Sequence, residues 1–208
     1  MPAPSTTREY HHGNLRQAIL STSLKLIEKK GIEALTLREI GRLAGVSRTA
    51  AYRHFADKDA LLGAISEVGF VEFGSALEQA RDAAGPKFEA RMKAMAEAYL
   101  RFASQRPAHY RVMFQWAAQL GHEQTAPTES WQHPANHSFD VLAGVITEGQ
   151  SQGKVRAGDP ANLARVVWAT VHGLALLPTN CDDKGLLSLC TEILLQGLRP
   201  TAETGLTV

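Results

Sequence analysis

The twenty residues from Thr36 to Phe55, TLREIGRLAGVSRTAAYRHF, constrain the fold of this chain more than any other segment. Thr36 and Glu39 have the S/T-x-x-E spacing of a capping box, in which the hydroxyl accepts the Glu39 N–H and the carboxylate returns to the Thr36 N–H. Gly45 suits the left-handed position after a helix, and Ser47 is a good N-cap for a second helix. The pattern predicts two short helices joined by a sharp turn. The first should bury a narrow apolar stripe formed by Leu37, Ile40, Leu43 and Ala44.

The second short helix is expected to have one packing face and one free face. At about 100° per residue, Ala51 and Phe55 point to one side, whereas Thr49, Ala50 and Arg53 point to the other. The free side offers a guanidinium, a hydroxyl and a methyl group, which are suited to reading base edges in the major groove of DNA. An ordinary surface pair of helices has the same glycine turn but does not need this outward chemistry. We therefore interpret the segment as a DNA-reading helix-turn-helix.

At this point the chain resembles the TetR-like (tetracycline-repressor-like) family of bacterial transcriptional regulators. The resemblance is strongest over residues 15–62, in the runs LRQAILSTSLKLIEKKG, TLREIGRLAGVS, AYRHF and DKDALL. YHHGNLR near the start, and the W-x-x-x-H-G motif from Trp168 to Gly173, resemble one branch of the family. The resemblance implies a three-helix DNA-binding domain, a C-terminal effector pocket and a homodimer.

Carried over by position, the resemblance also implies which side chains contact DNA. The base-facing residues would be Arg48, Thr49, Ala50 and Arg53. The remaining contacts, mostly to phosphates, would come from Thr36, Arg38, Ser47, Tyr52, His54 and Lys58. Many relatives have a hydroxylated residue where this chain has Ala50, so one possible hydrogen bond to the operator is missing.

The distribution of charge agrees with a DNA-reading N-terminal part. The formal net charge of the 208 residues is only +1, but residues 1–66 carry ten Lys and Arg against six Asp and Glu, a net charge of +4. We place a domain boundary near residue 57. Residues 1–57 would form the helix-turn-helix domain, with a mobile arm over residues 1–9 in which Arg8 can reach a minor groove. Residues 58–208 would form the effector-binding and dimerisation domain.

Hydrophobic periodicity predicts an all-α fold, because no segment has the strict alternation of an amphipathic strand. A shared helix from about residue 58 should lead from the first domain into the second. A polar loop is expected over residues 121–134. The other helices of the second domain should cover residues 88–105, 139–152, 159–177 and 184–198, and residues 108–120 form a segment dense in aromatic side chains.

The last two helices have more apolar positions than one packing face needs. These positions are Leu163, Val167, Val171 and Leu174 on the first and Leu186, Leu187, Leu194 and Leu198 on the second. A second apolar face must be buried against a partner, so the pattern predicts a homodimer held by a symmetric four-helix bundle. The alternative is that the two helices form the centre of a monomeric core.

Aromatic and methionine side chains of the second domain could line a ligand cavity: Tyr99, Phe102, Tyr110, Met113, Phe114, Phe139 and Trp168. Ordinary core packing explains the same helical spacing and is the simpler interpretation of any single residue. The effector pocket that the resemblance implies favours the first interpretation, with a small apolar or aromatic effector. His172 would then provide a polar contact, and the neighbouring Gly173 would permit close approach. The alternative, which is the simpler one, is a core histidine whose hydrogen bonds are satisfied within the protein.

Other motifs point to no further chemistry. Glu129, His133 and His137 would align three metal ligands on a continuous helix, but Pro134 argues against such a helix, so no metal and no cofactor are expected. Cys181 and Cys190 form no disulfide framework and are either small buried side chains or a redox pair. No run approaches a membrane span of about 20 residues, and no catalytic motif is recognisable.

We therefore expect a cytoplasmic, nucleoid-associated homodimer that binds a palindromic double-stranded DNA operator. It would act as a repressor that a small-molecule effector releases from DNA. Two alternatives remain open at this stage. One is a helical enzyme in which the helix-turn-helix is only scaffold, and the other is a ligand-sensing module that binds a partner without touching DNA. The basic outward face of Arg48, Arg53 and Lys58 favours the regulator, since an enzyme scaffold would not need it.

Overall fold

A computed structural model describes residues 12–116, 132–177 and 184–200, and these parts of the chain contain helices and no strand. The predicted all-α fold is confirmed. Residues 1–11, with the expected arm and Arg8, lie outside the described parts, as do Glu129 and Cys181. The α-helices are α1 (His12–Lys30), α2 (Leu37–Leu43), α3 (Arg48–His54), α4 (Lys58–Ala83), α5 (Phe88–Gln105), α6 (Pro107–Arg111), α8 (Gln132–Ser151), α9 (Pro160–Leu176) and α10 (Lys184–Leu198). Two short elements are the 3-10 helix η1 (Ile32–Ala34) and the π-helical turn η2 (Val112–Trp116).

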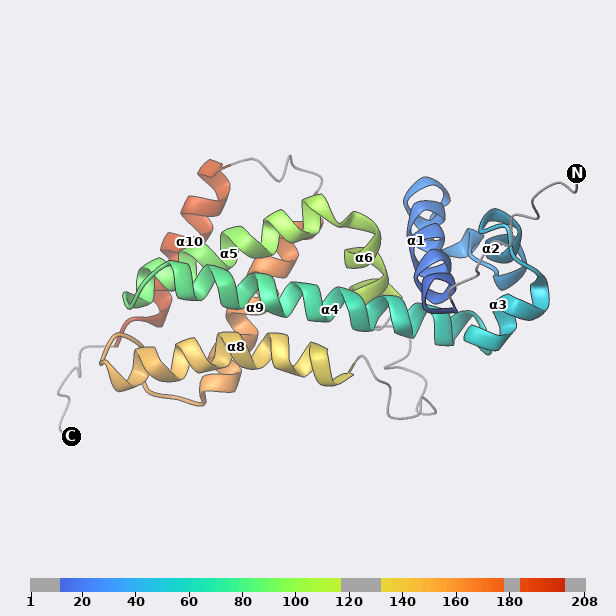
Figure 1. Ribbon diagram of the computed structural model, residues 1–208. Helices are drawn as coiled ribbons and strands as arrows, with labels where there is room; N and C mark the ends of the chain where they lie inside the picture. The colour runs from blue at the N-terminus through green and yellow to red at the C-terminus, as the bar shows by residue number, and fades with distance from the viewer. Residues whose placement is uncertain (1–11, 117–131, 178–183, 201–208) are drawn as a thin grey trace, which may run out of the picture.

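Helix α4 is the axis of the molecule (Figure 1). Helices α1, α2 and α3 cluster around its N-terminal end, and the other helices pack along the rest of its length (Figure 1). Its start is fixed locally, because the Asp57 carboxylate accepts the Ala60 N–H at 2.8 Å.

Two hydrophobic cores lie along α4. The N-terminal core consists mainly of buried residues of α1, α2, α3 and the start of α4, among them Ile19, Ile27, Ile40, Ala51, Leu61, Leu62 and Ile65. The C-terminal core contains later residues of α4 with residues of α5, α8 and α9, among them Phe70, Phe73, Leu77, Met95, Tyr99, Ile146 and Val171. Helix α4 therefore belongs to both cores, as the predicted shared helix should.

The start of α8 differs from the prediction. We expected a loop as far as Pro134 and a helix only from Phe139, but α8 begins at Gln132. Pro134 lies in its first turn, where a backbone N–H has no partner within the helix, so proline is tolerated there. Residues 117–131, which hold most of the expected loop, lie outside the described parts.

Among the described residues, α4 alone has the length and the mean hydropathy, 1.4, of a candidate membrane span. The sequence analysis did not identify this run. Of its most apolar window, 61% is buried inside the protein, which is the behaviour of a core helix.

Candidate nucleic-acid interface and ring cluster

The N-terminus of α2 forms half of the predicted capping box. The Thr36 hydroxyl accepts the Glu39 N–H at 3.2 Å. The Glu39 carboxylate does not return to Thr36, because it accepts two hydrogen bonds from the Arg42 guanidinium, at 2.9 and 2.7 Å. These bonds hold the pKa of the Glu39 carboxyl below its ordinary value. The reciprocal half of the box was therefore predicted wrongly.

The turn after α2 has the predicted geometry, but the buried stripe is narrower. Gly45 has φ 69°, and the Ser47 hydroxyl accepts the Ala50 N–H at 3.1 Å to start α3. Leu43, expected inside, is 44% exposed. In α2, only Leu37, Ile40 and Gly41 are buried.

Helix α3 presents the predicted packing face to the N-terminal core. Ala51 is completely buried and Phe55 nearly so. The side chains of Arg48, Thr49, Tyr52 and Arg53 are exposed. Ala50, predicted to point outward with them, is half-buried and packs against the N-terminal core, so it lies at the edge of the face. The Arg48 guanidinium lies 5.5 Å from the centre of the Tyr52 ring, a cation–π contact that orients it along the helix.

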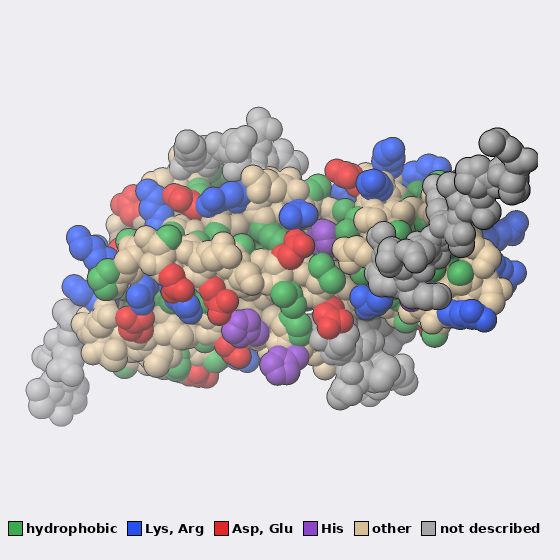
Figure 2. Space-filling model, in the orientation of Figure 1, with side chains coloured by type: hydrophobic (Ala, Val, Ile, Leu, Met, Phe, Trp, Pro, Cys, Tyr) green, Lys and Arg blue, Asp and Glu red, His purple; other side chains and the backbone are tan. Residues whose placement is uncertain are grey.

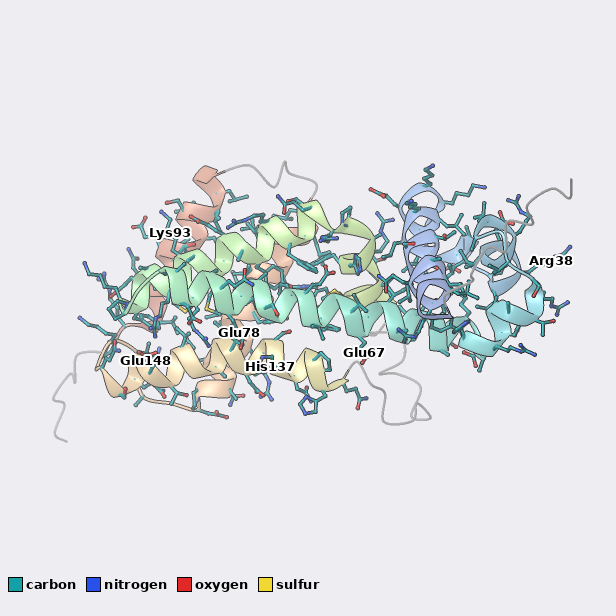
Figure 3. All side chains as sticks on the ribbon, viewed as in Figure 1. Arg38, Glu67, Glu78, Lys93, His137 and Glu148 are labelled. Atoms are coloured by element: carbon teal, nitrogen blue, oxygen red, sulfur yellow. The ribbon has the colours of Figure 1, made fainter. Side chains whose placement is uncertain are left out.

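The other predicted DNA contacts lie at the same end of the molecule. Thr36, Arg38 and Ser47 are exposed, whereas His54 and Lys58 are half-buried. Arg38 projects from α2 away from the body of the protein (Figure 3). On the face shown in Figure 2, Lys and Arg side chains gather over α1–α3, and most Asp and Glu side chains lie over the other helices. The ten predicted residues thus share one cationic end, and their contacts with DNA stay a prediction.

The aromatic residues predicted to line a cavity meet in the C-terminal core. We refer to them with two rings of α4 as the ring cluster: Phe70, Phe73, Tyr99, Phe102, Tyr110, Phe114, Phe139 and Trp168. The Tyr99 ring centre is 5.0 Å from that of Phe73 and 5.4 Å from that of Trp168, and both contacts are edge-to-face. Tyr110 and Phe114 are 4.7 Å apart. Met113 is fully buried in the same core.

Phe73 was missing from the predicted set although it contacts four rings of the cluster. Its helix is apolar almost all round in its middle, so the sequence gives no sign of which side faces the other aromatic residues. Contacts between α4 and α9 depend on the tertiary arrangement rather than on local spacing.

His172 supplies the polar centre of the ring cluster. Its Nδ1 lies 2.7 Å from the Tyr99 hydroxyl and 2.9 Å from the Tyr110 hydroxyl, and the two hydroxyls are 3.4 Å apart. Burial lowers the pKa of His172 and raises that of Tyr99, which favours the neutral form of both. A neutral imidazole with its proton on Nε2 accepts a tyrosine hydroxyl at Nδ1. Gly173 is exposed and a Cβ there would meet nothing within 4 Å, so packing among the described residues does not require glycine there, and the close approach of a ligand stays a prediction.

One small cavity lies between described residues at the edge of the ring cluster. A cavity of about 30 Å³ lies beside Tyr99 and Trp168, and its other walls are Leu77, Met92, Met95, Ala96, Leu142, Val167 and Val171. The rings themselves contact one another, with ring centres 4.7 Å apart for Tyr110 and Phe114 and 5.0 Å apart for Phe73 and Tyr99.

Of the three candidate metal ligands weighed in the sequence, Glu129 lies outside the described residues. His133 and His137 lie on α8, where the His137 Nε2 is 3.1 Å from a carboxylate oxygen of Glu78 on α4 (Figure 3). Within residues 12–116, 132–177 and 184–200, no group of three His, Cys, Asp or Glu could hold a metal ion. Cys190 is half-buried, and burial raises the pKa of its thiol, which disfavours the reactive thiolate.

Helices α9 and α10 have an exposed apolar face, but it is formed by other residues than those predicted. Val167, Val171 and Leu198 are buried in the C-terminal core, and Leu163, Leu174, Leu187 and Leu194 pack against that core. The exposed apolar side chains, 48 to 61% accessible, are Val166, Leu176, Leu177, Leu189 and Ile193. Periodicity gave the correct helices but did not separate the side that packs within the subunit from the side that is left open.

Comparison with known proteins points to one family. A family model described as "Bacterial regulatory proteins, tetR family" matches residues 19–65. A second model, "Tetracyclin repressor-like, C-terminal domain", matches residues 92–181. The tetracycline repressor protein class C of Escherichia coli is 42% identical over 52 residues, which are 25% of this chain. This chain thus covers only about a quarter, 24%, of the length of that curated relative.

Solved structures are similar over nearly the whole chain. A protein of unknown function from Rhodococcus sp. RHA1 is 32% identical with a TM-score of 0.77, and the match covers 92% of this chain and 98% of that one. A bacterial regulatory protein in the tetR family from Rhodococcus RHA1 shares the fold, with a TM-score of 0.73 and 20% identity over 90% of this chain and 98% of that one. With a family match in both halves and this shared architecture, the chain belongs to the TetR family of bacterial transcriptional regulators.

Proposed function

We propose that the protein is a sequence-specific DNA-binding regulator that represses transcription as a homodimer on a palindromic operator. The observation that carries the proposal is the face of α3. This helix is capped by Ser47 and held in the core by Ala51 and Phe55, and it exposes Arg48, Thr49, Tyr52 and Arg53. The alternative of a helical enzyme has no support in the comparisons, since the matched family consists of transcriptional regulators.

The exposed side chains of α3 are chemically suited to two tasks. Arg53 would donate to guanine O6 and N7, and Thr49 would offer a hydroxyl to a base edge. Tyr52 and Lys58 would contact phosphates, which would fix the position of the helix without reading sequence. The half-buried Ala50 offers only a methyl group at the edge of the face, so most of the base discrimination falls to Arg48, Thr49 and Arg53.

The test is selection of a duplex from a random-sequence library, followed by affinity measurements at several salt concentrations. The selected duplex should contain two half-sites about one helical turn apart, and affinity should fall steeply with salt. Arg53→Ala should cost about 1 to 3 kcal/mol and relax the base preference, whereas Lys58→Ala should weaken all sequences alike.

Arg101→Ala is the matched control, because it removes an exposed arginine from α5, far from α3. It should leave affinity and base preference unchanged. Unaltered binding and preference in the Arg53 variant would refute the assignment of the reading face.

We further propose that a small apolar or aromatic effector binds at the ring cluster and releases the protein from DNA. The cluster provides apolar walls and a polar centre, the two features that a small-molecule site combines. An incoming hydrogen-bond acceptor can take one of the two tyrosine hydroxyls that now compete for the single Nδ1 of His172. The effector would tilt α4 and change the separation of the two reading helices. DNA binding must then weaken effector binding by the same factor.

A thermal-shift and DNA-release screen of small apolar and aromatic compounds tests the effector site. An active compound should stabilise the wild type and lose its effect in Phe114→Ala. Val71→Ala, an exposed position on α4, is the control and should behave like the wild type. A compound that acts equally on the wild type, Phe114→Ala and a Trp168 variant would show that these rings are only core.

A further inference from the structure

A pocket at the far end of the molecule from α3 is lined by cationic side chains from three separate elements. Lys93 belongs to α5, Lys154 to the loop between α8 and α9, and Arg199 follows the last residue of α10. The pocket has a volume of about 280 Å³, which suits a small molecule. It lies beside α10, where Figure 3 labels Lys93, while α3 lies at the opposite end of α4 (Figure 1). None of its lining residues belongs to the ring cluster or to the exposed apolar face of α9 and α10.

Backbone hydrogen bonds fix the positions from which two of these cations project. The Lys154 N–H donates to the Gly149 carbonyl at 2.8 Å, which holds the loop on the end of α8. The Arg156 N–H donates to the Leu198 carbonyl at 2.7 Å, so the same loop is also attached to the last turn of α10, next to Arg199. A ligand at this place therefore meets walls that already exist, and less ordering free energy opposes its binding.

The floor of the pocket is apolar, or its polar groups are already hydrogen-bonded. Phe88 at the start of α5 is buried, and Leu195 of α10 is half-buried. Thr191 is also buried, and its hydroxyl donates to the Leu187 carbonyl at 2.8 Å. Because these side chains exclude water from one side, charges on the rim act through a lower effective dielectric constant than that of bulk water.

The charged groups on the rim are not used up by one another. The three cationic groups have no ion pair and no side-chain hydrogen bond with any residue that the structure describes. Two carboxylates, of Glu89 and Glu192, line the same pocket, so its lining carries a net charge of +1. The Glu192 carboxylate accepts the Gln196 Nε2–H at 3.1 Å and has further lone pairs to offer. The rim thus combines donors for an anion with acceptors for hydroxyl groups.

We propose that this pocket binds a small organic phosphate that carries hydroxyl groups, such as a sugar phosphate. Cations that approach from three elements suit the oxygens of a phosphate, which point in three directions, better than the two coplanar oxygens of a carboxylate. The phosphate would lie between Lys93, Lys154 and Arg199, and the guanidinium can donate two parallel hydrogen bonds to it. Glu192 and Gln196 would accept hydrogen bonds from the hydroxyl groups. The site goes beyond the proposed function, because it involves neither the reading face nor the ring cluster.

The first experiment measures binding to the full chain by titration calorimetry. The probes are glucose 6-phosphate, ribose 5-phosphate and glycerol 3-phosphate, with inorganic phosphate and the unphosphorylated sugars for comparison. We expect at least one organic phosphate to bind about tenfold more tightly than inorganic phosphate, and the sugars to give no binding at the same concentrations. Failure of all three organic phosphates to bind, or an affinity no greater than that of inorganic phosphate, would overturn the proposal.

The second experiment places the bound phosphate. Lys93→Gln, Lys154→Gln and Arg199→Gln each remove one exposed cation of the pocket, and Lys25→Gln removes an exposed lysine from α1 as the matched control. Each pocket variant should lose affinity about tenfold or more, because a charge-assisted hydrogen bond is lost. The control should bind like the wild type, and all four variants should melt like the wild type without ligand. An unchanged affinity in the three pocket variants would show that the phosphate binds elsewhere.

The third experiment tests the carboxylate side of the pocket, with Glu192→Gln as the variant. Removing one negative charge should tighten the binding of inorganic phosphate about threefold. The organic phosphate should gain less, because an amide is a weaker acceptor for its hydroxyl groups than a carboxylate. The preference for the organic phosphate should therefore narrow. An unchanged ratio of the two affinities would refute the assignment of the hydroxyl-binding side to Glu192.

Discussion

Gly144 and Gly149 lie on the same helix, α8, but differ in their surroundings. A Cβ at Gly149 would be 2.6 Å from the Val155 Cγ2 and 2.8 Å from the Phe88 ring, whereas a Cβ at Gly144 would meet nothing within 4 Å. Gly149→Ala should lower the free energy of unfolding by about 1 to 3 kcal/mol, because a buried ring cannot yield without losing its packing. Gly144→Ala should raise it by up to about 1 kcal/mol, since alanine favours helix. Urea denaturation measures the free energy of unfolding of both variants. Equal changes in this free energy would mean that the close packing at Gly149 does not determine the stability.

Part of the pH dependence of the protein's stability should come from His172. Burial lowers its pKa below the ordinary value of 6.5. Below pH 6.5 the unfolded chain binds a proton at this imidazole before the folded protein does, so this part of the stability is complete above pH 6.5 and is lost as the pH falls through the folded pKa. Between pH 7 and pH 5, the melting temperature of the wild type should fall further than that of His172→Gln, whose side-chain oxygen still accepts a tyrosine hydroxyl. Parallel curves for the two proteins would contradict this.

At the scale of elements, the start of α4 depends on one side chain. The Asp57 carboxylate accepts the Ala60 N–H, and α4 contributes to both cores. Asp57→Ala should lower the free energy of unfolding by about 1 kcal/mol, because it leaves this N–H without a partner. Asp57→Asn should keep most of the stability, since asparagine caps a helix about as well as aspartate. Thermal unfolding of both variants is the measurement, and an alanine variant as stable as the asparagine variant would show that the cap does not hold α4.

The caps also explain which elements the sequence predicts well. Thr36, Ser47, Asp57 and Asp159 each accept an N–H two or three residues away, so their helices begin where local chemistry requires. The exposure of Leu43 depends instead on how a short helix sits on a core made by other helices. The same holds at the candidate site. Helical spacing identified Tyr99 and Tyr110, and the resemblance with the neighbouring Gly173 identified His172, but neither gave a sign that Phe73 joins them.

At the scale of the whole molecule, the described residues of α9 and α10 leave an apolar face exposed. Val166 and Ile193 are 61% and 59% exposed, and Leu189 is 54% exposed on α10. Exposed apolar side chains gathered on two adjacent helices are typical of an interface between subunits. In an isologous dimer the same face of both copies meets across a two-fold axis, so one substitution changes the interface twice.

Ile193→Asp should therefore separate the dimer that we propose. The substitution places two carboxylates in an apolar interface, where their desolvation is not compensated, and the protein should sediment as a monomer. Two half-sites at fixed spacing need two reading helices held at that spacing, so affinity for the full palindrome should fall towards that for one half-site. Ser188→Asp adds the same charge to an exposed position on another side of α10 and should leave both properties unchanged. Sedimentation and duplex titration of the two variants test these expectations. An Ile193→Asp variant that stays dimeric would place the interface elsewhere. A monomeric variant that still binds both half-sites tightly would show that reading DNA does not need the dimer.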